Sequence, residues 1–540
     1  MVPKFPLSKR SLLTTALILI FIWSLLAVPW SSELIHSGGG ATLLEIFMGL
    51  LQPDLSKQIL LLALKSSWIT LAYAVCGMTI AILIAAIFGT YASGVLAITS
   101  RTRFASKGFF RGILGFMRAI HELVWAWLFV ATFGLSPYAA ILALAIPYGG
   151  ILGRIYADLL NDAPKEPIEA LRVAGATKLQ ELIYGYFPYV RANLLSYTMY
   201  RFECAIRSSA IMSFVGLGGL GYQIQLSLDD LKYNEVWTFL FFLIVLVVFV
   251  DSWSNRIRNG LELHHHPSWT NRISFILTTV LLLGSWAYVY IGENASFLAL
   301  FTQENALYAG KFLKGIIGIG DEHVAYLDKE SWMVALSLTY ETLRMSIIAI
   351  GFATIVMFLT VIPAAGNVAN GSLTLFKHWY NWVAFAIIRL AYIFSRAIPE
   401  LVWAMIILFI FKPGILPGAI ALALHNFGIL GKLCAEVIED IDHRPIRNLA
   451  SSGASQAQIL IYGIIPTVLP QFLTYILYRF EVIMRTTIVV GFVGAGGLGQ
   501  QFKLNMSYFN YTGITLLLFC YMILVVLADT LSGSSRYLAK

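Results

Sequence analysis

Charge is what this sequence has least of. Only 12% of the 540 residues are Asp, Glu, Lys or Arg, while 58% are hydrophobic; soluble globular domains carry about 25% charged residues. Several apolar runs are long enough to cross the roughly 30 Å of a bilayer's hydrocarbon core as helices. The composition therefore excludes a soluble globular fold and predicts an all-α integral membrane protein.

Cysteines and nucleotide-binding motifs are also scarce. The four cysteines lie far apart in apolar stretches, which predicts neither disulfides nor a zinc site. Both Gly-Lys pairs, at 310–311 and 431–432, continue with Phe or Leu, so the chain lacks the phosphate-binding Gly-x-x-x-x-Gly-Lys-Ser/Thr loop. We expect no nucleotide hydrolysis, no cofactor and no metal on this chain. The histidine run 264–266 is interpreted as part of a solvated linker, 251–272.

What the sequence does contain is a tandem duplication. Residues 396–499 align on 118–221 without a gap, at an offset of 278. Each copy begins with Arg-Ala-Ile-x-Glu-Leu-Val-Trp-Ala, continues with Tyr-Arg-Phe-Glu and ends with Phe-Val-Gly-x-Gly-Gly-Leu-Gly. Charged residues kept at one offset in apolar surroundings exclude chance. We therefore predict two repeats, 1–260 and 261–540.

Each repeat has six predicted spans, giving about 12 transmembrane helices. The first six are at about 12–30, 69–97, 113–133, 138–160, 193–215 and 236–250, and the second six at about 273–291, 342–364, 383–411, 416–438, 472–490 and 514–531. An uncleaved first helix is favoured over a signal peptide. Because each repeat has an even number of spans, both repeats have the same orientation across the membrane, as in parallel-repeat transporters. Basic residues in alternate loops predict that both termini are cytoplasmic, and they favour membrane loops over a nucleic-acid surface.

The loop between the fourth and fifth spans has a distinctive spacing. Glu169 and Ala170 are followed by Gly175 and, thirteen residues later, by Pro188. A glutamate complements the positive end of a helix, and a glycine permits a bend closed to other residues. The second copy keeps the glycine and proline but has an arginine in place of the glutamate, which is unfavourable in a first helical turn. We expect the second loop to form but not to be equivalent to the first. Its residues are Arg447, Gly453 and Pro466.

The glycine-rich ends of the duplicated segment match Gly-x-Gly-x-x-Gly. A dinucleotide site requires a preceding strand, whereas a predicted membrane helix precedes each copy, so we reject that interpretation. These glycines are expected to break the helix and to allow close backbone approach near a transport pathway. They are Gly216, Gly218, Gly219, Gly494, Gly496 and Gly497.

Ionisable residues inside the spans are costly and therefore functional candidates. Four pairs are four residues apart, so each pair is expected to share a helix face: Arg118 with Glu122, Arg396 with Glu400, Glu203 with Arg207, and Glu481 with Arg485. The favoured interpretation is that these pairs neutralise one another and hold helices together. The alternative is that they line a pathway. For Arg201 and Arg479, which point elsewhere, contact with a passing oxyanion is as good an interpretation.

These motifs together resemble the permease of phosphonate ABC importers. The loop spacing is similar to the EAA loop of ABC-importer permeases, which docks on a cytoplasmic ATPase. The resemblance implies a type I-like importer fold, here a fused pair working as one chain per complex in the bacterial inner membrane. It further implies two ABC ATPase copies that bind ATP and Mg, and a periplasmic or lipid-anchored binding protein that delivers phosphonate, phosphite, hypophosphite or a related oxyanion.

The mechanism implied is alternating access between the two halves. Two alternatives stay open: an ABC permease for methionine or a quaternary amine, and an ATPase-independent secondary transporter. A membrane enzyme is disfavoured, because His121 has Pro399 as its counterpart and no catalytic set occurs in both repeats.

Overall fold

The computed structural model describes residues 9–26, 28, 30, 34–36, 38–262, 269–320, 323–373 and 378–539, so the histidine run 264–266 lies outside the described residues. Within those ranges the regular secondary structure is helical, apart from one isolated bridge between Ile35 and Phe411. Eight helices are long and apolar enough to cross a membrane, or up to eleven if three bent pairs each count as one span. The predicted all-α membrane architecture is confirmed, although the described helices give fewer spans than twelve.

The helices divide into two compact units, Glu45–Gly315 and Met1–Leu44 with Ile316–Lys540. The first contains α3 (Lys57–Ser93), α4 (Ser100–Ala119), α5 (Glu122–Phe133), α6 (Pro137–Asn161), α7 (Lys165–Val173), α8 (Lys178–Gln180), α9 (Phe187–Met212), α10 (Leu220–Asp229), α11 (Tyr233–Glu262), α12 (Trp269–Ala287) and most of α13 (Gln303–Ile317). The other contains α1 (Lys9–Leu26), α14 (Lys329–Thr360), α15 (Gly366–Ala369), α16 (Trp379–Ala397), α17 (Glu400–Leu408), α18 (Ile415–Glu439), α19 (His443–Ser451), α20 (Gln456–Gln458), α21 (Ile465–Gly491), α22 (Gly497–Ser507) and α23 (Tyr511–Ala539). Helix α2 (Gly39–Leu51) crosses the boundary.

Each compact unit includes the opening helix of the other predicted repeat. Helix α12 packs on α3, where the rings of Trp68 and Tyr288 meet edge to face at 6.3 Å. Helix α1 packs on α14 in the same manner, with Phe21 against Phe352 at 5.8 Å. The repeat boundaries read from the sequence stay a prediction, because compactness and duplication divide the chain at different places.

Small residues bring the central helices of the first unit close together. A side chain at Gly77 would meet Leu144, and one at Gly89 would meet the backbone of Gly153. Helices in membranes gain packing energy from such close approach. This α3–α6 contact is the most extensive in the chain and supports the elements around it.

The third predicted span and its counterpart are broken helices. Helices α4 and α5 meet at 88°, and α16 and α17 at 93°. In the first break the ring Nδ1 of His121 accepts the backbone N–H of Leu123 and caps α5; in the second, Pro399 disfavours a helical conformation at the residue before it. The prediction that Arg118 shares a helix face with Glu122, and Arg396 with Glu400, is therefore wrong.

The sixth span is longer than predicted. Helix α11 continues to Glu262, through residues that the sequence assigned to a polar linker beginning at Asp251. Asp251, Trp253 and Ser254 are buried, and Arg258 forms an ion pair with Glu203 of α9. The ion pair with Glu203 neutralises Arg258 and so allows this part of α11 to remain helical and enclosed.

Candidate functional site: docking loops and buried charges

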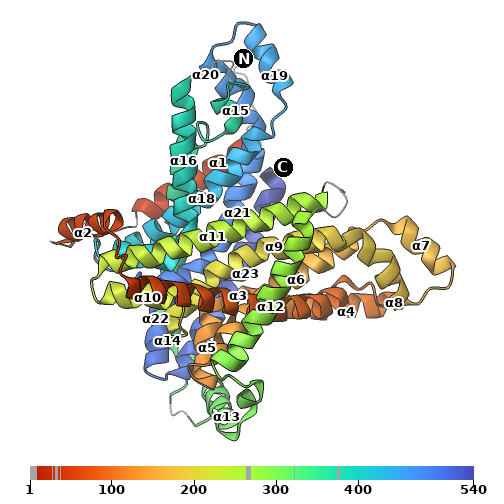
Figure 1. Ribbon diagram of the computed structural model, residues 1–540, viewed down its shortest axis with the longest axis vertical. Helices are drawn as coiled ribbons and strands as arrows, with labels where there is room; N and C mark the ends of the chain where they lie inside the picture. Colours follow the sequence, from red (N-terminus) through yellow and green to blue (C-terminus); the bar gives the residue numbers. More distant parts are fainter. Residues whose placement is uncertain are drawn as a thin grey trace. The chain divides into compact units, whose positions relative to one another are not determined.

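The first candidate docking loop has a helix, a bend and a second helical segment. Helix α7 is followed by Gly175 at φ +84° and then by α8. Nothing lies within 4 Å of where a Cβ on this glycine would be, so backbone conformation alone makes glycine favourable here. Glu169 and Ala170 are both exposed on α7, and the loop forms one end of its unit (Figure 1).

The second loop repeats this geometry. Helix α19 is followed by Gly453 at φ +85° and then by α20. Arg447 is exposed on α19 and lies beyond the first helical turn, which begins with His443 and Arg444. The second loop is thus fully built despite the loss of the glutamate.

A π-helical segment joins each loop to the long helix that follows. It spans Glu181–Tyr186 before α9 and Ile459–Ile464 before α21, and Pro188 or Pro466 stands in the first turn of the long helix. A proline ring clashes with the carbonyl four residues earlier and donates no hydrogen bond. The wider π spacing accommodates that clash, because the N–H of Phe187 bonds five residues back, to Leu182.

The two bends are held together differently. In the first loop, buried Glu181 accepts hydrogen bonds from Arg172 at 3.2 Å and from Lys178 at 2.8 Å, which ties α7 to α8 across Gly175. The corresponding residues of the second loop are Ile459, Ala450 and Gln456. Ile459 is buried among apolar side chains. One loop is therefore braced by charge and the other by apolar packing.

We expect Glu181→Ala to loosen the first loop. The substitution removes the acceptor shared by two cations; because both cations are partly exposed, the expected cost is about 1 kcal/mol. Hydrogen exchange of the amides in 170–185 should rise about fivefold. A matched control, Arg172→Ala/Lys178→Gln/Glu181→Ile, copies the second loop and should exchange near the wild-type rate; exchange as fast as in Glu181→Ala would contradict this account.

Both loops expose large apolar side chains. Val173 is 89% exposed and Tyr184 69% exposed in the first loop, and Tyr462 is 72% exposed in the second. Exposed apolar groups clustered on one element mark a protein or membrane contact. The first loop is richer in them: Val173, Leu179 and Tyr189 have Ser451, Ala457 and Thr467 as counterparts.

The glycine-rich segments end α9 and α21 by sharp turns. All six predicted glycines have positive φ, between +67° and +104°. The turn then docks on a neighbouring helix, because Thr70 of α3 accepts the N–H of Leu220 at 2.9 Å and Thr342 of α14 accepts that of Leu498 at 3.0 Å. The helix break and the close backbone approach are present, while lining of a pathway stays a prediction.

Each repeat buries a quartet of charged residues between its fifth and sixth long helices. The members correspond at the offset of 278: Glu203, Arg207, Asp251 and Arg258 in the first repeat, and Glu481, Arg485, Asp529 and Arg536 in the second. Two acids and two arginines make each quartet formally neutral. Only the first two members of each quartet were predicted from the sequence, although the constant offset also marks the other two.

Ion pairs occur within both quartets. Glu203 lies 3.4 Å from Arg258, with Asp251 beside it. In the second repeat, Glu481 contacts Arg485, as its spacing predicts, and lies 3.3 Å from Arg536. Arg485 also lies 3.5 Å from Asp529. These contacts favour a helix-locking role.

Arg201 and Arg479 contact polar or aromatic groups. The Arg201 guanidinium lies 5.5 Å from the centre of the Tyr200 ring. The Arg479 Nε donates to the side-chain oxygen of Asn426 at 3.0 Å. Asn426 is the counterpart of Tyr148, which is buried near Arg201.

A histidine lies beside the carboxylate at each helix break. The Nε2 of His121 is 3.5 Å from Glu122, and the Nε2 of His425 is 3.5 Å from Glu400. His425 comes from α18, at the position that corresponds to Pro147. The counterpart of His121 was missed because the second repeat supplies its histidine from a different helix.

The remaining contacts of these carboxylates are with neighbouring helices. Glu122 accepts a hydrogen bond from Ser208 of α9, whose hydroxyl also lies 2.9 Å from that of Tyr148. The Nδ1 of His425 is 2.9 Å from the carbonyl oxygen of Ile398, at the break itself. In the part of the chain that the structure describes, no three His, Cys, Asp or Glu residues are grouped to hold a metal ion.

Comparisons with known proteins agree with this architecture. The family described as binding-protein-dependent transport system inner membrane component matches residues 89–262 and again 365–537. The phosphate-import permease protein PhnE of Mycolicibacterium smegmatis is 28% identical over 86% of this chain and 84% of its own length. The phosphite transport system permease protein PtxC of Stutzerimonas stutzeri is 32% identical over 38% of this chain and 70% of its own length.

A solved structure of the MetNI methionine ABC transporter, in an inward-facing conformation, matches 38% of this chain and 99% of its own at 22% identity. Its TM-score of 0.34 is too low to argue a common fold. The family match covers more than half of the chain, once in each repeat. The chain therefore belongs to the inner-membrane component family of binding-protein-dependent transport systems: it is a multi-pass ABC-importer permease with two permease domains in tandem, and not an enzyme.

Proposed function

We propose that this permease imports phosphonate or a related phosphorus oxyanion such as phosphite or hypophosphite. The family supplies the importer role. The substrate class is supported by the relatives, one named for phosphate import and another for phosphite transport. The observation that carries an ATP-driven mechanism is the doubled docking loop, in which a positive-φ glycine separates two helical arms and large apolar side chains are exposed.

The partners follow from the same loops. We propose that each loop binds one ABC ATPase subunit, which carries the ATP and Mg, and that a binding protein delivers substrate from the other membrane side. With two permease domains in one chain, a single chain would serve each complex. The basic loops favour cytoplasmic termini. ATP-driven movement of the loops would then produce alternating access.

The buried charges divide into two roles. Each quartet is formally neutral and contains an ion pair, Glu203–Arg258 or Glu481–Arg485, so we propose that the quartets hold helices together. Arg201 and Arg479 are the candidates for contact with the substrate, because a guanidinium fork matches two oxygens of a phosphonate. The glycine turns are proposed to position these helices beside the pathway.

ATPase stimulation tests the proposed function. The chain would be reconstituted with its co-expressed ATPase and binding protein, and titrated with methylphosphonate, aminoethylphosphonate, phosphite, hypophosphite, phosphate, methionine and glycine betaine. We expect severalfold stimulation by phosphorus oxyanions alone. Stimulation by methionine or betaine would overturn the substrate class, and uptake without any copurifying ATPase would favour a secondary transporter.

A further inference from the structure

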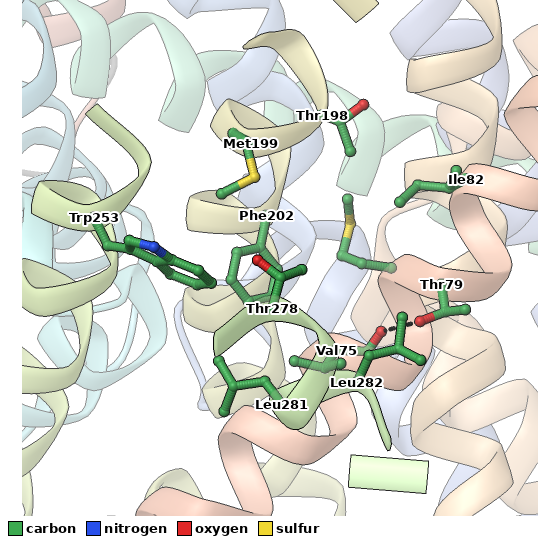
Figure 2. A pocket seen from close by; sticks show the side chains of 11 residues that line it. Val75, Thr79, Ile82, Thr198, Met199, Phe202, Trp253, Thr278, Leu281 and Leu282 are labelled. Carbon is green, nitrogen blue, oxygen red and sulfur yellow. Dashed lines mark hydrogen bonds between the residues drawn. The ribbon is translucent and has the colours of Figure 1, made fainter. Parts of the chain in front are cut away.

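An apolar pocket lies in the first unit, among α3, α9, α11 and α12. Its volume is about 100 Å³, of the same order as an engineered cavity that binds benzene (~150 Å³). Figure 2 shows Trp253 on one side and Thr79 and Ile82 on the opposite side, with Leu281 between them below. Thr278 and Ile82 are exposed at its margin, so the pocket opens on the surface of the helix bundle.

The threonine hydroxyls that line the pocket already donate within the protein. The hydroxyls of Thr79, Thr198 and Thr278 each donate to a backbone carbonyl four residues earlier on their own helices. Helix α12, which forms one wall, is only 11% buried over its membrane-spanning window. A pocket walled by a helix that faces hydrocarbon is accessible to lipid acyl chains.

One polar atom of the lining is unsatisfied. Trp253 is 8% exposed, and its Nε1 is buried without a hydrogen-bond acceptor in the described structure. The ring is fixed edge to face against Phe202 at 6.5 Å. A buried N–H without a partner is costly, and tryptophan commonly lies where acyl chains meet the polar headgroup region. We therefore place the headgroup end of the pocket at Trp253.

Two exposed arginines lie on α11 and α12, the two helices that carry Trp253 and Thr278. Arg256 is three residues after Trp253 on α11, hence one turn farther on a similar face. Arg272 is six residues before Thr278 on α12, about 9 Å along the helix axis. Helix α11 runs antiparallel to α9, because Arg258 lies over the Tyr200 ring and Asp251 lies near Arg207. Helix α11 therefore ends, and α12 begins, on the side of the docking loops. Basic groups there match the phosphate of an anionic lipid.

We propose that this pocket binds one anionic phospholipid, with an acyl chain between α3 and α12, its headgroup end near Trp253 and the phosphate at Arg256 and Arg272. The site is independent of the proposed substrate and of the docking loops. It belongs to the first repeat alone, since the positions corresponding to Trp253 and Arg256 are Leu531 and Ser534. One lipid per chain is therefore expected.

Native mass spectrometry of the delipidated full-length chain tests the proposal. Phosphatidylglycerol and phosphatidylcholine with identical acyl chains would be titrated in mild detergent, and thermal unfolding followed in parallel. We expect one tightly held phosphatidylglycerol per chain, a rise in Tm, and at least tenfold weaker retention of phosphatidylcholine. Equal retention of the two lipids, or several equivalent lipids per chain, would overturn the proposal.

Variants separate the two ends of the site. Arg256→Gln/Arg272→Gln should weaken phosphatidylglycerol roughly tenfold and leave phosphatidylcholine unchanged. Thr278→Trp, which fills the pocket margin from an exposed position, should weaken both lipids. The control Arg101→Gln/Arg103→Gln removes two exposed arginines of α4 on the same membrane side and should change neither. Phosphatidylglycerol retention that neither test variant changes would contradict the site. Displacement of phosphatidylglycerol by glycerol phosphate alone would also contradict it, because it would indicate a site for small anions.

Discussion

Replacing both bend glycines, Gly175→Val with Gly453→Val, is expected to reduce coupled uptake at least severalfold while the chain still inserts in the membrane. Both glycines have φ near +85°, a conformation in which a β-branched residue is a clear outlier. Such backbone strain costs about 1–3 kcal/mol at each site. Because nothing lies within 4 Å of the added Cβ, the strain can be relieved only by changing the bend itself.

Changing the bend moves α7 relative to α8 and α19 relative to α20, and so misplaces the proposed ATPase contacts. If half of the combined strain, about 1–3 kcal/mol, opposes docking, association weakens about fivefold to more than a hundredfold, at 1.4 kcal/mol per tenfold. Uptake and substrate-stimulated ATPase activity in reconstituted vesicles would measure the loss. Membrane accumulation of the chain should stay near normal, because both glycines are exposed.

A matched control is available on α4. Gly108→Val with Gly112→Val introduces the same side chain twice, also with nothing within 4 Å, but at helical positions without positive φ. This variant should transport like the wild type. Normal coupled uptake by the bend variant would refute the docking assignment, and equal loss in both variants would show that added apolar bulk rather than backbone geometry was responsible.

Glu481→Gln is expected to cause the largest loss of stability. The carboxylate contacts Arg485 and Arg536, and its side chain is only 7% exposed. Removing it leaves the quartet with a net positive charge in a region where water and salt screen poorly. Breaking a buried ion pair costs about 3–5 kcal/mol. The lower end applies here, because the Arg536 side chain is 30% exposed and Arg485 retains Asp529.

A second substitution tests whether net charge is the cause. Glu481→Gln with Arg536→Gln restores neutrality and should recover much of the lost Tm and membrane accumulation. The control Glu304→Gln alters an exposed glutamate of α13 and should be silent. If the stability loss of the double variant equals the sum of the losses of the two single variants, the account of a neutral, helix-locking quartet is refuted.

Features set by neighbours in the chain could be predicted from the sequence. The duplication gave the two permease domains, and uninterrupted apolar runs gave most of the spans. The spacing of Gly175 and Gly453 located both loop bends, because only glycine adopts positive φ at little cost. The same reasoning placed the helix breaks at Gly216 and Gly494. In each case the physical cause acts within one or two turns of backbone.

The partners of the buried carboxylates could not be predicted from local sequence. The sequence showed that Glu203 and Glu481 must be neutralised, because a lone charge in hydrocarbon is costly. It did not show that Arg258 and Arg536 contribute, since helix α11 had first to continue through a stretch that looks like a linker. The equivalence of His121 and His425 could not be predicted for a similar reason. The two histidines occupy positions that do not correspond in the repeats, yet each places its imidazole 3.5 Å from the carboxylate at a helix break.

The sequence by itself thus determined the membrane class, the duplication, the docking-loop bends and the charges that need partners. Only the tertiary structure decided that α4 and α16 end before Glu122 and Glu400, that α1 and α12 pack on units containing the other repeat, and that a tryptophan and an apolar pocket meet at α12. These outcomes depend on packing between helices far apart in the chain, where shape and charge complementarity outweigh local propensity.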